Sequence, residues 1–171
     1  MSEQPFNVLF LCSGNSARSI LAEGLINHWG RGHFVGYSAG SDPAPEIHAM
    51  ALELLKLMKV PTEGLRSKSW DEFAAPGAPE MDFVFTVCDD AAGEVCPAWP
   101  GQPMTAHWGI ADPAAVSGTE AEQRAAFRRA FSELDSRIKI FTNLPIRTLD
   151  RIKLQEHLHA IGKSQPVEEV A

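Results

Sequence analysis

Hydrophobic and polar positions along the chain form alternating strand-like and helix-like segments. Short, continuous apolar runs are typical of strands buried on both faces, whereas apolar residues spaced about three or four apart are typical of helices. The predicted strands are residues 6–11, 33–37, 83–87 and 104–108. The predicted helices are residues 20–29, 46–59, 119–141 and 148–161, together with a short helix within 67–74.

Strands that alternate with helices predict an α/β fold, in which a parallel sheet is covered by helices on both faces. The length of 171 residues suits one domain with a sizeable core. We expect this single domain to span residues 1–162 and residues 163–171 to form a flexible tail. In such sheets, ligands bind at the carboxyl ends of the strands.

Three side chains with useful chemistry follow the predicted strands. Cys12 comes directly after the first strand and Cys88 directly after the third, and Asp112 follows the fourth within a few residues. Because the carboxyl ends of parallel strands meet at one edge of the sheet, we expect these three residues to lie close together. This convergence predicts a site at that edge.

The loop after the first strand has the properties of an oxyanion cradle. Residues 12–19 read Cys-Ser-Gly-Asn-Ser-Ala-Arg-Ser, and the small side chains between Cys12 and Arg18 let the backbone curl and aim several N–H groups at one point. The helix that follows adds free N–H groups and the positive end of its dipole. The loop lacks the Gly-Lys-Ser/Thr ending of a nucleotide-binding P-loop and is not a dinucleotide fingerprint. The predicted oxyanion-binding residues are Ser13, Gly14, Asn15, Ser16, Ala17, Arg18 and Ser19.

Cys12 combines two features that favour an ionised thiol. A free cysteine has a pKa of about 8.5, and a helix N-terminus beside an arginine lowers it to between about 3.5 and 7.5. The planar guanidinium of Arg18 can bind two oxygens of a tetrahedral anion. The Ser19 hydroxyl can donate to the Cys12 sulfur, and Asn15 can brace the loop. The alternative is a buried, inert cysteine, but the strand before the loop and the helix after it favour an oxyanion site.

Asp112 stands before Pro113, and this position biases its backbone toward an extended conformation. A carboxyl group aimed at the loop can protonate a leaving oxygen. The same Asp-Pro pair is equally typical of an ordinary turn. The sequence leaves both interpretations open.

Cys88 and Cys96 flank a loop that is rich in small and acidic residues. A zinc site is disfavoured, because the gap is too long for a tight Cys-x-x-Cys arm and His107 is the only plausible helper nearby. The two thiols are either unrelated core residues or the partners of a redox relay. In a relay, the loop brings Cys96 to Cys88 for thiol–disulfide exchange.

The charge of the chain narrows the range of partners. With 15 basic and 22 acidic residues, the net charge is −7 at pH 7, which disfavours binding to nucleic acid or to an anionic membrane. An anionic substrate must therefore be attracted locally, by the loop.

The sequence has no secretory signal and no long apolar span, which predicts a cytoplasmic protein. Three cysteines, an odd number, argue against a structural disulfide framework.

Several segments together resemble a known family. The loop over 12–19 resembles the signature loop of the low-molecular-weight protein tyrosine phosphatases. Further motifs are similar to those of the arsenate reductases built on that fold, namely Val-Cys-Asp-Asp (87–90), Cys-Pro (96–97), His-Trp-Gly (107–109) and Asp-Pro-Ala (112–114). The resemblance runs from about residue 7 to about residue 141. It implies a three-layer α/β fold with a four-stranded parallel sheet in the order 2-1-3-4, helices on both faces, and no cofactor.

The resemblance also implies a role for each residue of the site. Cys12 is then the nucleophile, Arg18 the oxyanion clamp and Asp112 the general acid. Cys88 is the resolving thiol and Cys96 the third thiol, so the implied activity is reduction of arsenate to arsenite. The implied partners are an arsenate- or phosphate-type oxyanion and a re-reducing thiol system, either thioredoxin or glutathione with glutaredoxin.

Departures from the family pattern bear on these implications. Phosphatases of this fold usually carry a tyrosine just after the Asp-Pro pair, whereas Ala114 and Ala115 follow it here, which favours the reductase. The alternative is a phosphotyrosine or small-phosphoester phosphatase that needs only Cys12, Arg18 and Asp112. A third interpretation is a non-enzymatic oxyanion or redox sensor in which Cys12 is reversibly oxidised.

Two further departures concern the relay and a possible ion. The gap between Cys88 and Cys96 is a residue longer than in thioredoxin-linked members, so both thiol systems stay open. Some members bind potassium near the loop. Residues Asn15, Glu23 and Ser38 match such a site, but an acidic ligand is missing around Lys68, so no metal site is predicted.

Overall fold

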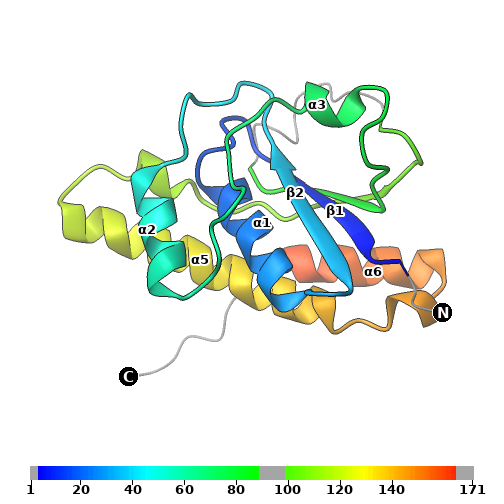
Figure 1. Ribbon diagram of the computed structural model, residues 1–171. Coiled ribbons are helices and arrows are strands. Elements are labelled where there is room, and N and C mark those ends of the chain that lie inside the picture. Colours follow the sequence, from blue (N-terminus) through cyan, green and yellow to red (C-terminus); the bar gives the residue numbers. More distant parts are fainter. Residues whose placement is uncertain (1–3, 89–98, 165–171) are drawn as a thin grey trace.

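The computed structural model (Figure 1) describes residues 4–88 and 99–164. Its central sheet has four parallel strands. The strands are β1 (Phe6–Leu11), β2 (Phe34–Ala39), β3 (Phe83–Thr86) and β4 (Met104–His107). They lie in the order β2-β1-β3-β4, and every neighbouring pair is parallel. The predicted α/β fold with sheet order 2-1-3-4 is therefore confirmed.

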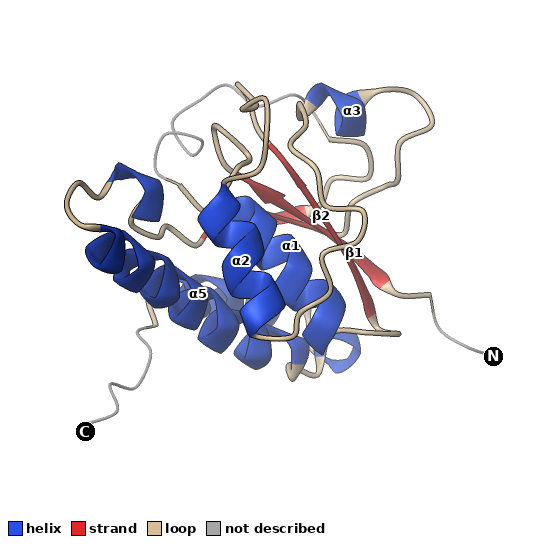
Figure 2. Ribbon diagram, turned by 60° about the vertical axis from the view of Figure 1, so that its left-hand side comes forward, coloured by secondary structure: helices blue, strands red, loops and turns tan. Residues whose placement is uncertain are grey.

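The described helices cover the two faces of the sheet unequally (Figure 2). The longer helices are α1 (Arg18–Trp29), α2 (Ala49–Leu57), α5 (Glu120–Thr142) and α6 (Arg151–Gly162). Their buried side chains form one large core with Val8 and Phe10 of β1. A smaller core holds Leu9, Leu11 and Phe73, the last from the short helix α3 (Asp71–Ala74). Alternate side chains of β1 thus enter opposite cores, which explains its continuous apolar sequence.

An aromatic cluster fixes the chain just after β4. The indole ring of Trp108 stacks on Phe85, with 3.9 Å between ring centroids, and meets Phe141 edge-on. Its Nε1–H donates to the carbonyl of Leu158 at 3.0 Å, which ties the buried ring to α6. Since Trp108 directly follows β4, this packing anchors the segment that carries residues 109–112.

Several boundaries differ from the predicted ones by one to three residues, and two of them bear on the site. Strand β2 continues to Ala39 instead of ending at 37. Helix α2 begins at Ala49 rather than at 46, because His48 forms its N-cap and accepts the Met50 N–H on Nδ1 at 3.1 Å. The residues before His48 are used instead to hold the loop that follows β1.

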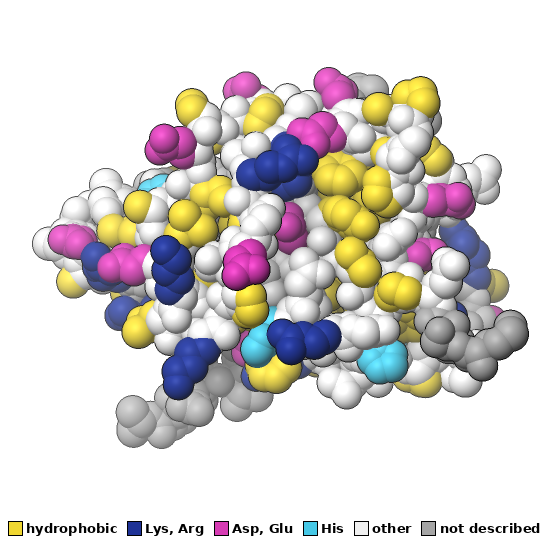
Figure 3. Space-filling view, viewed as in Figure 1, with side chains coloured by type: hydrophobic (Ala, Val, Ile, Leu, Met, Phe, Trp, Pro, Cys, Tyr) yellow, Lys and Arg dark blue, Asp and Glu magenta, His cyan; other side chains and the backbone are white. Residues whose placement is uncertain are grey.

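The surface has mixed charge and carries a groove away from the predicted site. Acidic and basic side chains are interspersed on the face shown in Figure 3. Within residues 4–88 and 99–164, no helix has the length and apolar character needed to cross a membrane.

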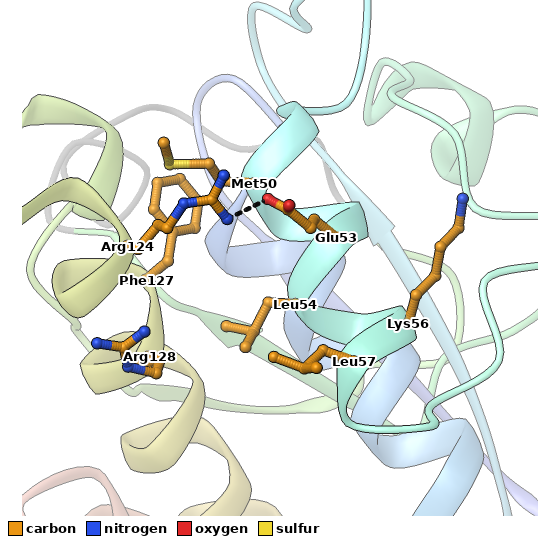
Figure 4. A pocket seen from close by; sticks show the side chains of 8 residues that line it. All are labelled: Met50, Glu53, Leu54, Lys56, Leu57, Arg124, Phe127 and Arg128. Atoms are coloured by element: carbon orange, nitrogen blue, oxygen red, sulfur yellow. Dashed lines mark hydrogen bonds and ion pairs between the residues drawn. The ribbon is translucent and has the colours of Figure 1, made fainter. Parts of the chain in front are cut away.

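A groove of about 410 Å³ lies between α2 and α5, away from the predicted site, with an ion pair of Arg124 and Glu53 beside it (Figure 4). Its lining residues are Met50, Glu53, Leu54, Lys56, Leu57, Arg124, Phe127 and Arg128.

Candidate oxyanion site

Backbone hydrogen bonds fix the outer side of the loop between β1 and α1. The segment 40–48 runs along this loop, and three of its N–H groups donate to loop carbonyls at 2.8–2.9 Å. The donor and acceptor pairs are Asp42 with Ser13, Ala44 with Gly14, and His48 with Ser16. These bonds engage the loop carbonyls from the outer side, so an anion on the inner side can accept hydrogen bonds from loop N–H groups.

Asn15 braces the loop from within, as predicted. It is fully buried and has a φ of 45°, in the left-handed region. Its Nδ2 donates to the hydroxyls of Ser19 at 2.8 Å and Ser38 at 3.0 Å, and its Oδ1 accepts the backbone N–H of Lys68 at 2.9 Å. The Ser19 hydroxyl takes part through its oxygen, so its proton can still be donated to the Cys12 sulfur.

The start of α1 and the segment after β4 bring Arg18 and Asp112 together. Nη1 of Arg18 donates to the carbonyl of Ile110 at 2.9 Å, and Nη2 lies 3.6 Å from Oδ2 of Asp112. The other carboxylate oxygen of Asp112 accepts the N–H of Ala114 at 2.9 Å and caps the 3-10 turn η1 (Pro113–Ala115). Asp112 therefore forms a turn and faces Arg18 at the same time, so the two interpretations of the Asp-Pro pair are compatible.

Cys88 lies against Cys12 at the mouth of the loop. Both thiols are buried, with 5% of Cys12 and 1% of Cys88 exposed, and they are hydrogen-bonded to each other. The Ser13 N–H also donates to Sγ of Cys88 at 3.2 Å, and the Ser13 hydroxyl lies 3.7 Å from the same sulfur. The predicted meeting of the first and third strand ends is confirmed. Cys96, the third thiol of the predicted relay, lies outside the described residues.

The contact between the two thiols changes the acidity of Cys12. The hydrogen bond with Cys88 raises the pKa of Cys12, and so does burial, whereas the Arg18 charge and a hydrogen bond from the Gly14 backbone lower it. The net direction is upward, so the predicted lowering is wrong for this arrangement. The physical reason is that two thiols in contact hold one negative charge far more easily than two.

Arg18, Asp112 and Cys88 face a common hollow. A depression of about 550 Å³ opens at this edge of the sheet. It is lined by Arg18, Cys88, Gly109, Ile110, Ala111, Asp112 and Ala115. The small side chain of Ala115 adds no aromatic ring to its wall. A tetrahedral anion in this hollow meets a guanidinium, a carboxyl group and a thiol.

Behind the loop lies a buried ion pair that sequence reasoning missed. Nζ of Lys68 is 3.5 Å from Oε1 of Glu23, and the two residues are only 7% and 8% exposed. Burial raises the pKa of Glu23 and lowers the pKa of Lys68, while the attraction between the two charges opposes both shifts. The sequence held two hints, a glutamate among the apolar residues of the predicted helix 20–29 and a lysine where the matching potassium site needs an acidic ligand.

The residues that match a family potassium site do converge at this pair. Asn15, Glu23 and Ser38 lie together, and the Lys68 ammonium is placed among their polar atoms, 3.5 Å from the Ser38 hydroxyl. Among the described residues, no group of three or more His, Cys, Asp or Glu side chains is arranged to hold a metal ion. The disfavoured zinc interpretation involves Cys96 and therefore falls partly outside those residues.

Fold and site together define a class of protein. The carboxyl ends of a parallel sheet present a loop of small residues, a cysteine at its mouth, an arginine at the start of the next helix and an aspartate opposite. These are the features of a cysteine-dependent protein that binds tetrahedral oxyanions.

Comparison with known proteins gives the family. A sequence model of the family described as low molecular weight phosphotyrosine protein phosphatase matches residues 7–155, and the chain belongs to this family. One curated relative is the arsenate reductase of Halalkalibacterium halodurans. It is 38% identical over 139 residues, which cover 78% of this chain and 93% of the relative.

Solved structures share the fold. An arsenate reductase from Archaeoglobus fulgidus has a TM-score of 0.63 and 26% identity, over 80% of this chain and 99% of that chain. A thioredoxin-dependent arsenate reductase of Corynebacterium glutamicum has a TM-score of 0.59 and 26% identity, over 81% of this chain. The present chain spans 61% of the length of the Corynebacterium structure.

Proposed function

We propose that this chain is an arsenate reductase that uses Cys12 and Cys88. The observation that carries the proposal is the Cys88 thiol, which is hydrogen-bonded to Cys12 and held by the Ser13 N–H. A phosphatase of this fold needs only the nucleophile, the arginine and the general acid. A second thiol in contact with the nucleophile is what reduction requires. The relatives named arsenate reductase support the same choice.

The first step is binding and attack. Arsenate has the shape and charge of phosphate, so it fits the loop N–H groups and the guanidinium of Arg18, which exchanges its bond to Ile110 for arsenate oxygens. The Cys12 thiolate attacks arsenic, and one arsenic–oxygen bond breaks. Asp112 donates its proton to the departing oxygen, which leaves as water. The product is a covalent Cys12–arsenate adduct, with arsenic still in its +5 state.

The second step is reduction. The Cys88 thiolate attacks Sγ of Cys12, a Cys12–Cys88 disulfide forms, and the sulfur–arsenic bond breaks with its electron pair on arsenic. Arsenic is thereby reduced by two electrons, and arsenite leaves. Once Cys12 carries arsenic it no longer competes for ionisation, and the Ser13 N–H stabilises the Cys88 thiolate. Cys88 can then lose its own proton to solvent, and the thiolate that forms is the nucleophile of this step.

The final steps restore the enzyme. Cys96 attacks Cys88, which releases the Cys12 thiolate and leaves a Cys88–Cys96 disulfide. An external dithiol then reduces this disulfide. The Corynebacterium relative is named as thioredoxin-dependent, which favours thioredoxin over glutathione with glutaredoxin as the reductant.

Disulfide mapping after a single exposure to arsenate tests the scheme. Wild type is expected to release one arsenite per chain and to end with a Cys88–Cys96 disulfide. The matched variant Cys96→Ser is expected to release one arsenite and to stop at a Cys12–Cys88 disulfide, whereas Cys88→Ser releases none.

Full arsenate turnover by Cys88→Ser would refute the relay. Fast aryl-phosphate hydrolysis that is indifferent to Cys88, without arsenite release, would instead identify the phosphatase alternative. A sensor would show neither turnover and only reversible oxidation of Cys12.

A further inference from the structure

A buried hydrogen-bond network runs from the Lys68–Glu23 pair to the oxyanion loop. The Ser38 hydroxyl donates to Oε1 of Glu23 at 2.6 Å and accepts from Nδ2 of Asn15 at 3.0 Å. Oδ1 of Asn15 in turn accepts the backbone N–H of Lys68 at 2.9 Å. Ser38 and Asn15 are fully buried, and Lys68 and Glu23 nearly so. Lys68 thus enters the network twice, through its ammonium group and through its backbone.

The charge on Glu23 decides the direction of these hydrogen bonds. A carboxylate only accepts, so Ser38 gives its single proton to Glu23 and can only accept from Asn15. A protonated Glu23 can instead donate to Ser38. The Ser38 oxygen then has another donor and no longer requires the hydrogen bond from Asn15. The Asn15 amide would then lose part of what orients it, and its left-handed backbone, which persists only while its surroundings hold it, would be released.

A buried carboxylate needs a compensating charge to stay ionised, because desolvation favours its neutral form. The Lys68 ammonium supplies that charge at 3.5 Å and is itself held by the carbonyl of Arg66 at 2.6 Å. We propose that Lys68 is a positioning residue for oxyanion binding, whose buried ammonium keeps Glu23 ionised and so fixes the bonds that hold Asn15 in the loop. The inference rests on the proposed function only in that the loop receives an oxyanion.

The test measures how well inorganic phosphate protects Cys12 from alkylation by iodoacetamide. Lys68→Met keeps most of the apolar stem and removes the charge, and it is expected to need about 10- to 100-fold more phosphate for half-protection, the scale of a small misplacement of binding groups. Ser38→Ala removes only the linking hydroxyl and is expected to weaken protection in the same direction. The control Lys56→Met, on the exposed side of α2, is expected to match wild type.

Chemical rescue separates positioning from a purely structural role. Methylammonium is expected to restore phosphate protection to Lys68→Ala, because it can donate to Glu23 from the vacated space. Tetramethylammonium at the same ionic strength cannot donate and is expected to have no effect. Glu23→Gln is expected to be weakened and not rescued by either ion.

Unchanged phosphate protection in Lys68→Met and Ser38→Ala would overturn the inference. The inference would also be overturned if methylammonium restored the melting temperature of Lys68→Ala without restoring the protection of Cys12 by phosphate. If Lys68→Met does not fold, Ser38→Ala and the rescue of Lys68→Ala decide the question. The readout needs no arsenate turnover, so a chain that shows these phosphate effects but never releases arsenite refutes the proposed function and supports the inference.

Discussion

Gly40 lies so close to the oxyanion loop that Gly40→Ala must displace it. A Cβ atom at position 40 would lie 2.4 Å from the carbonyl oxygen of Ser13 and 2.6 Å from that of Cys12. Gly40 cannot retreat easily, since its N–H donates to the Lys68 carbonyl and its own carbonyl accepts the Trp70 N–H, both at 2.9 Å. The loop backbone is therefore the part that moves.

The size of the displacement sets the expected effect. Real Cβ atoms essentially never come closer than 3.0 Å to such an atom, so the Ser13 carbonyl has to move by roughly half an ångström or more. A misplacement of about 1 Å costs about 100-fold in catalysis, and we expect kcat/KM for arsenate to fall by about 10- to 100-fold. Overpacking of this kind costs about 1–3 kcal/mol, which lowers the melting temperature by about 2–12 °C for a domain of this size.

Arsenite release in a single turnover and thermal unfolding together test this prediction. The matched control is Gly24→Ala in α1, where the added Cβ meets only side-chain methyl groups, of Leu55 at 3.3 Å and of Val60 at 3.4 Å. A helix-interior alanine also has the better helix propensity, by about 1 kcal/mol, so Gly24→Ala should keep both activity and stability. A Gly40→Ala protein with wild-type turnover and phosphate protection would refute the reasoning, even if its melting temperature fell.

Three other substitutions test single interactions. Arg18→Lys replaces a planar fork by a point charge and should raise the phosphate concentration that half-protects Cys12 by more than about tenfold; an unchanged value would contradict the clamp. Cys88→Ala removes the hydrogen bond that contributes most to the raised pKa of Cys12, so alkylation of Cys12 should begin at lower pH. An unchanged pH dependence of alkylation would contradict this role of Cys88. Trp108→Phe leaves a buried carbonyl of α6 without its donor and should lower the urea-measured unfolding free energy by about 1–3 kcal/mol. As a control, Trp29→Phe breaks the exposed hydrogen bond to Asp135 and should lower the unfolding free energy by less than about 0.5 kcal/mol. Equal losses of unfolding free energy in the two variants would refute the stabilising role given to the Trp108 hydrogen bond.

The sheet was predictable because burial on both faces leaves a clear pattern in the sequence. Strands β1 and β3 are continuous apolar runs, and the helices between the strands leave little freedom in topology. The start of α2 was not predictable. It depends on His48, whose N–H holds the loop carbonyl of Ser16 while its ring caps the helix. His48 thus connects the loop after β1 to the start of α2, and no local sequence pattern indicates this double role.

The location of the site was predictable, but its electrostatics were not. Cys12 and Arg18 belong to one local motif, and strand ends alone bring Asp112 near them. The acidity of Cys12 depends on Cys88, which is remote in sequence and whose contact only the folded chain defines. The Lys68–Glu23 ion pair was not predictable for the same reason, because its two residues come from separate parts of the chain.

Discrimination between arsenate and phosphate must arise after binding. In the proposed mechanism, the loop N–H groups, Arg18 and Asp112 recognise shape and charge, which the two anions share. A phosphate bonded to the Cys12 sulfur is released by attack of water on phosphorus, because thiols do not reduce phosphorus(V). An arsenate adduct can also be released by attack on sulfur, since arsenic accepts the electron pair. In the proposed relay, Cys88 makes this second attack, and the Ser13 N–H donates to its sulfur. Phosphate should therefore compete for the loop without following the reductive path.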